Sequence, residues 1–118
     1  ATSASNNIAT PNTHLDHSTL GSQKAFLAKF FPSGVRHWGT YYGSGGPDEA
    51  LSCSASSAGH VYMAGWTNTT FGTSVGTQNS HQPWFGGASR DAFLVKFDVC
   101  EMAPSQPSYF NGPQAVCA

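Results

Sequence analysis

Residues 91–97, Asp-Ala-Phe-Leu-Val-Lys-Phe, decide the fold, because residues 24–30 read Lys-Ala-Phe-Leu-Ala-Lys-Phe and so nearly repeat them. The offset between the two copies is 67 residues, and it holds without gaps when residues 1–31 are aligned with residues 68–98. Ten aligned positions are identical, where chance would supply about two. Outside the two quoted runs they include Thr10/Thr77, Asn12/Asn79, His14/His81 and Ser22/Ser89. The chain therefore holds one full repeat and part of a second.

Strand-like segments and turns alternate along each repeat. Short apolar and aromatic runs predict strands over residues 25–30, 35–42, 51–55, 60–67 and 92–97. Phe31-Pro32-Ser33-Gly34 and Ser57-Ala58-Gly59 predict hairpin turns, because proline fixes φ and glycine accepts a positive φ. No stretch has helical periodicity. We therefore expect an all-β fold in which four antiparallel strands per repeat form one blade of a β-propeller.

Composition and charge exclude two classes of protein. The 118 residues carry five Lys and Arg against six Asp and Glu, for a net charge of −1. A nucleic-acid-binding surface needs a basic patch, which so few cations do not supply. No apolar run approaches the roughly 20 residues of a membrane span. We expect no nucleic-acid partner and no membrane insertion.

Three segments resemble the SBBP-type repeats of bacterial secreted proteins, which form seven-bladed β-propellers. They are DAFLVKFD at residues 91–98, RHWGTYYGSGG at residues 36–46 and AGHVYMAGWT at residues 58–67. The three segments follow one another in the same order as in the family's repeats, and the resemblance extends over residues 1–98. It departs at Ser56 and His60, where the family usually has Asp and Asn. The resemblance implies a partial propeller.

The blade boundaries follow from the same resemblance. It places a partial blade at residues 1–43 and the next blade at about residues 48–98. After residue 98 the family would continue into an outer strand with Trp and Tyr-Tyr, but here the repeat stops. The missing outer strand is then expected from elsewhere in a longer parent chain.

Residues 99–118 have a different character. Three prolines, Pro104, Pro107 and Pro113, predict a linker. Residues 111–118, NGPQAVCA, are similar to the opening of the Ig-like (PKD-like) modules of large Bacteroidetes surface proteins. That resemblance implies the start of an Ig-like module and export to the cell surface by the type IX secretion route.

Polar clusters offer little chemistry. His14-Leu15-Asp16-His17 holds two imidazoles and a carboxylate, but zinc needs three or four ligands and no matching pair follows. Asp48 and Glu49 are adjacent residues that we expect in the glycine-rich loop, and glycosidase carboxylates must instead face each other across a cleft. No Gly-x-Ser-x-Gly motif or P-loop is present. We expect no catalytic residues, no metal site and no cofactor.

Aromatic residues fall into two groups. Five stand at strand positions, where we expect them to pack in the core: Trp38, Tyr41, Tyr42, Tyr62 and Trp66. Trp84 lies instead in the long polar segment between Pro83 and Phe85. Trp84 is therefore the residue that we expect to be exposed and the candidate contact for a ligand such as a glycan.

The three cysteines have different settings. Cys53 holds an apolar position in a strand, so we expect a buried thiol. Cys100 and Cys117 flank the proline-rich segment and could pair in an oxidising compartment. Cys117 could equally pair with a later cysteine of an Ig-like module, because connectivity does not follow from sequence.

These observations favour a non-catalytic propeller segment of a large secreted or cell-surface protein, acting as a scaffold or adhesin-type interaction module. Its partners would be the remaining blades of the parent chain or other protein subunits. One alternative is a glycan-binding lectin that forms a propeller by homo-oligomerisation. Another is a non-catalytic part of an extracellular enzyme.

Overall fold

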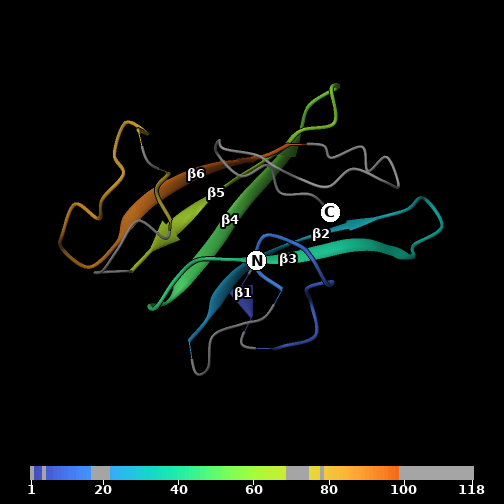
Figure 1. Ribbon diagram of the computed structural model, residues 1–118, viewed down its shortest axis with the longest axis horizontal. Coiled ribbons are helices and arrows are strands. Elements are labelled where there is room, and N and C mark those ends of the chain that lie inside the picture. The colour runs from blue at the N-terminus through green and yellow to red at the C-terminus, as the bar shows by residue number, and fades with distance from the viewer. Residues whose placement is uncertain (1, 4, 17–21, 69–74, 78, 99–118) are drawn as a thin grey trace.

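The computed structural model describes residues 2–3, 5–16, 22–68, 75–77 and 79–98 (Figure 1). Within these ranges all regular structure is strand and no helix is present. The expectation of an all-β fold is thus confirmed. The strands are β1 (Thr2–Ser3), β2 (Lys24–Phe30), β3 (Arg36–Tyr42), β4 (Asp48–Ala55), β5 (Val61–Thr67) and β6 (Asp91–Phe97). No helix in the described ranges has the length and apolar character to cross a membrane.

The strands form two antiparallel sheets with the orders β1-β2-β3 and β4-β5-β6. Figure 1 shows the two sheets crossing, with the glycine-rich connection 43–47 leading from one to the other. The predicted hairpin turns are confirmed at both β2–β3 and β4–β5. Gly34 has φ +83° and its N–H donates to the Phe31 carbonyl at 2.9 Å. The Gly59 N–H donates to the Ser56 carbonyl, also at 2.9 Å.

One apolar core lies between the two sheets. The first sheet contributes a face of β2 and β3, and the second contributes a face of all three of its strands. The buried side chains are Ala25, Leu27, Trp38, Tyr42, Ala50, Met63, Phe93 and Phe97. The ring of Tyr42 packs between the sheets, with its centroid 5.1 Å from that of Phe93. Burying one large apolar side chain contributes about 1.5–3 kcal/mol, so this shared core is what holds the sheets together.

Residues 5–16 cover the free edge of β3. The Thr10 N–H donates to the Gly39 carbonyl at 2.9 Å, and the Tyr41 N–H donates to the Leu15 carbonyl at 3.0 Å. The hydroxyl of Tyr41 accepts from the Ile8 N–H at 3.1 Å. An uncovered edge strand offers unpaired backbone groups to other chains. This segment satisfies those groups within the same chain.

The sequence repeat is also a repeat of conformation. Asn12 has φ 64° and its aligned partner Asn79 has φ 68°. A positive φ is uncommon outside glycine and is tolerated best by Asn and Asp. The identity at this position therefore preserves a backbone turn that both copies adopt.

Candidate functional site

A buried ion pair joins the two sheets where the glycine-rich connection ends. The Lys24 ammonium lies 3.1 Å from Asp48 Oδ2, and both side chains are fully buried. Lys24 Nζ also donates to the Ser22 hydroxyl and the Gly46 carbonyl, each at 2.7 Å. All three protons of the ammonium thus have acceptors. Such full pairing is what allows a charge to be buried.

Asp48 accepts hydrogen bonds from two further donors. The Thr67 hydroxyl donates to Oδ1 at 2.5 Å, and the Ser44 N–H donates to Oδ2 at 2.9 Å. Gly43 has φ +132°, and a Cβ at this position would collide with the Asp48 carboxylate. The backbone needs glycine here for both reasons. Asp48 therefore fixes β2, the connection and β5 against one another.

The structure corrects the expected position of the two adjacent carboxylates. Asp48 and Glu49 are the first residues of β4 rather than part of the loop. Successive side chains of a strand point to opposite faces, so the two carboxylates do not face each other. Nothing in the sequence singled out Lys24 as the partner, because the pairing depends on how the two sheets meet.

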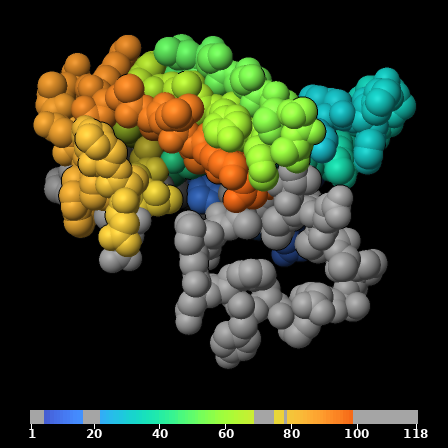
Figure 2. Space-filling model, turned by 90° about the horizontal axis from the view of Figure 1, so that it is seen from above, coloured from blue at the N-terminus to red at the C-terminus, as the bar shows by residue number. Residues whose placement is uncertain are grey.

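Trp84 lies on a loop that is held at both flanks. Its side chain is 65% exposed, as the sequence predicted. The Gln82 amide donates to Asp91 Oδ2 at 3.2 Å, and the Gly86 N–H donates to the same oxygen. Figure 2 shows this part of the chain extending from one end of the molecule, opposite the β2–β3 hairpin. The structure thus presents an indole on a loop that Asp91 ties to β6.

The strand aromatics divide by face. Trp38, Tyr41 and Tyr42 are buried, which confirms the expectation for these three. The expectation is wrong for Tyr62, which is 37% exposed, and Trp66 is only half-buried. These two residues lie on the face of β5 that points away from the core. Arg90 covers Trp66 instead, with its guanidinium carbon 3.9 Å from the ring centroid.

The histidines are dispersed. His14 stacks on Tyr42 with 5.6 Å between ring centroids and meets Phe97 edge-on, so burial lowers the pKa of its imidazole. His17 falls outside the described residues. In the described part of the chain, no three His, Cys, Asp or Glu side chains gather in a way that could hold a metal ion.

A small charged network lies at the end of β6. Asp98 Oδ1 lies 2.6 Å from Lys96 Nζ and 3.0 Å from His60 Nδ1. The hydrogen bond from Lys96 lowers the pKa of Asp98, and the charges of Lys96 and His60 lower it further. Both ends of the Lys96–Asp98 pair are solvated, so the network contributes little to stability.

The expectation for Cys53 is wrong, because its thiol is exposed. A register shift between Ala50 and Ser52 interrupts the pairing of β4 with β5. Beyond that shift residues 51–55 are all exposed at the edge of their sheet. Cys100, Cys117 and the predicted linker and module start at 99–118 lie outside the described residues.

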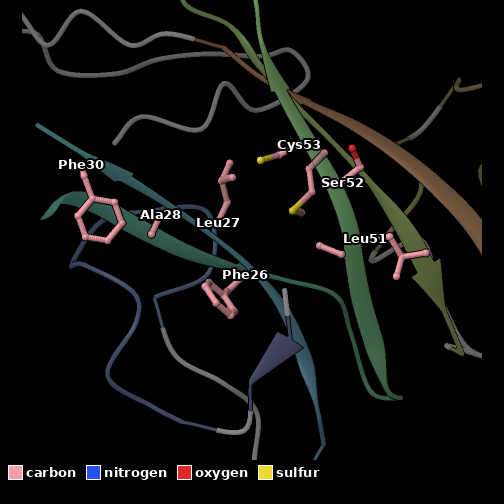
Figure 3. A pocket seen from close by; sticks show the side chains of 9 residues that line it. Phe26, Leu27, Ala28, Phe30, Leu51, Ser52 and Cys53 are labelled. Atoms are coloured by element: carbon pink, nitrogen blue, oxygen red, sulfur yellow. The ribbon is translucent and has the colours of Figure 1, made fainter. Parts of the chain in front are cut away.

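An apolar groove of about 260 Å³ runs between β2 and β4. Figure 3 shows side chains from both strands bordering it, with Phe26, Ala28 and Phe30 on one side and Leu51 and Cys53 on the other. No sequence pattern marks this groove, because its two walls belong to different sheets.

No family model, curated protein or solved structure matches this chain. The likeness to SBBP-type repeats and to Ig-like modules therefore stays a prediction from the quoted segments.

Proposed function

We propose that the chain is a segment of a β-propeller. In this proposal it is a non-catalytic part of a large secreted or cell-surface protein and serves as a scaffold or adhesin-type interaction module. The observation that carries the proposal is the way in which the two sheets stack.

The stacking joins two different faces of the same repeat. Leu27 of β2 is 8% exposed in the core, whereas its repeat equivalent, Leu94 of β6, is 75% exposed. The reverse holds for the phenylalanines. Phe97 of β6 is 2% exposed, whereas its equivalent, Phe30 of β2, is 57% exposed. The leucine face of one sheet therefore receives the phenylalanine face of the next.

A head-to-tail contact of this kind leaves one unpartnered face at each end. Repetition of such a contact gives a ring if the rotation closes, and an open filament if it does not. A ring of radially stacked antiparallel sheets is a β-propeller. The exposed Leu94 face and the exposed Phe30 face are thus the surfaces on which further repeats would pack. In this proposal those repeats are the main partners of the chain.

The intact mass of the native polypeptide tests the proposal. An antibody raised against the β2–β3 hairpin would recover the polypeptide from its source for mass spectrometry. The proposal predicts a mass far above 12.4 kDa, because the remaining blades belong to the same chain. A mass near 12.4 kDa would contradict it.

Trp84 supports a second candidate function, a glycan-binding lectin whose ring forms from several copies. An exposed indole on a tethered loop offers a stacking surface for a sugar ring. Glycan-array binding that is lost in Trp84→Ala and kept in Phe31→Ala, which changes another exposed aromatic residue, would favour this candidate. Catalytic activity located on other blades of the parent would instead favour a non-catalytic part of an extracellular enzyme.

A further inference from the structure

The two copies of the repeated strand differ in their partners. All seven residues of β6 pair with β5, from Val61↔Phe97 to Thr67↔Asp91. In the first sheet, β1 pairs only with Lys24 and Ala25. Within the described residues, Phe26–Phe30 therefore pair with β3 alone. The second sheet thus displays the strand that the first sheet lacks along this edge.

The apolar groove lies where that strand would run. Its walls are Phe26–Ala28 and Phe30 of β2 and Ala50–Cys53 of β4, with Met63 completing the lining. β1 contacts both β2 and β4, so the groove continues the line of β1 (Figure 3). The open strand edge and the apolar walls therefore coincide.

We propose that this groove is an acceptor site for an extended strand with the residue pattern of Val61–Gly65, supplied by a further repeat unit. The strand runs antiparallel to β2 and in line with β1. Backbone hydrogen bonds to the open edge give the affinity, and alternate side chains give the specificity. The inference deepens the proposed function and rests on the same repeat.

The register between β5 and β6 predicts which side chain the bound strand needs opposite each residue of β2. Equivalents of Val61 and Met63 lie opposite Phe30 and Ala28 and extend their apolar face. The equivalent of Ala64 lies opposite Leu27, on the face towards β4, where a small side chain is needed. A second copy of this chain does not supply the strand, because its own β5 is paired on both sides by β4 and β6.

Alkylation of Cys53 tests the proposal directly, because this exposed thiol lines the groove. The full chain carries Cys100→Ser and Cys117→Ser, which leave Cys53 as its only thiol. The probe is a synthetic peptide with the sequence of residues 59–65, GHVYMAG, which ends before the two β2 positions that β1 occupies. At ten times the Kd, mass action leaves about one-eleventh of the sites open, so alkylation by iodoacetamide should slow about tenfold.

Matched variants show whether the effect belongs to the groove. Leu51→Lys places a charge on an exposed wall residue and should abolish the slowing. Val35→Lys introduces the same charge at a similarly exposed position outside the groove and should keep it. A peptide with Val61→Lys and Met63→Lys should give no slowing.

Several outcomes would overturn the proposal. They include no slowing with the peptide and equal slowing with the lysine-substituted peptide. Alkylation of Cys53 that is already slow without peptide, compared with a fully accessible thiol, would also overturn it. It would assign the groove to a second copy if the protein is a dimer, and to residues 99–118 if it is a monomer. None of these results bears on the native mass, which tests the propeller itself. A native mass near 12.4 kDa would in turn leave peptide binding intact.

Discussion

At the scale of single residues, the Lys24–Asp48 pair makes the sharpest prediction. Lys24→Met leaves a buried carboxylate without its cation, which costs about 3–5 kcal/mol. Lys29→Met, an exposed lysine on the same strand, should stay within about 0.5 kcal/mol. Urea denaturation of the three proteins measures the free energies of unfolding. Equal losses in the two variants would show that the buried pair has no special role.

A second prediction concerns the pH dependence of stability. Burial against Tyr42 lowers the pKa of His14 below its usual 6.5, so the unfolded chain binds a proton more readily than the folded one. Stability from this group is complete above pH 6.5 and falls as the pH drops towards the lowered pKa. His14→Gln should flatten this part of the profile, measured as the urea midpoint between pH 8 and pH 5.

The histidine aligned with His14 in the sequence repeat, His81, provides the control for that experiment. His81 is exposed, and His81→Gln should leave the profile as in the unmodified chain. The carboxylate of Asp98, whose pKa is lowered from 3.8, acts only at more acidic pH and does not overlap this range. An unchanged slope in His14→Gln would contradict the assignment.

At the scale of elements, the glycine-rich connection sets how the sheets meet. Gly43→Ala forces a Cβ against Asp48 and should cost about 3 kcal/mol or more, because it disturbs the buried pair. Gly34→Ala also meets a positive φ, but in open space, and should cost only about 1–2 kcal/mol. Thermal or urea unfolding separates the two. A smaller loss for Gly43→Ala would mean that the connection yields easily.

The strands and turns were the part of the fold that could be predicted from the sequence. Strand positions and the turns at Gly34 and Gly59 depend on local chemistry, so periodicity and turn residues predicted them. The repeat identified Asn12 and Asn79 as equivalent, and their shared conformation follows. The expectation for Cys53 was wrong because the alternation of a strand does not tell whether either face is covered, and residues 51–55 are exposed on both faces.

The candidate site was less accessible to the same reasoning. Trp84 could be placed on the surface, since it stands among polar and turn-forming residues. Lys24 could not be paired with Asp48, and the groove could not be foreseen. Both depend on the distance between two sheets, which no local pattern encodes.

At the scale of the whole molecule, the unpartnered faces predict head-to-tail association. The weight-average mass of the isolated chain in sedimentation experiments should rise with concentration, as the Leu94 face of one copy meets the Phe30 face of another. Leu94→Lys should reduce this association strongly. Val35→Lys, at an exposed position in the β2–β3 turn, should not. Equal association in both variants would exclude the Leu94 face as the contact.

Electron cryomicroscopy of the native polypeptide tests the central claim most directly. The account predicts a ring of radial antiparallel sheets in which both sheets described above are neighbours, with Leu94 buried against the phenylalanine face of a following repeat. A closed two-sheet domain with Leu94 and Phe30 still in solvent would contradict it.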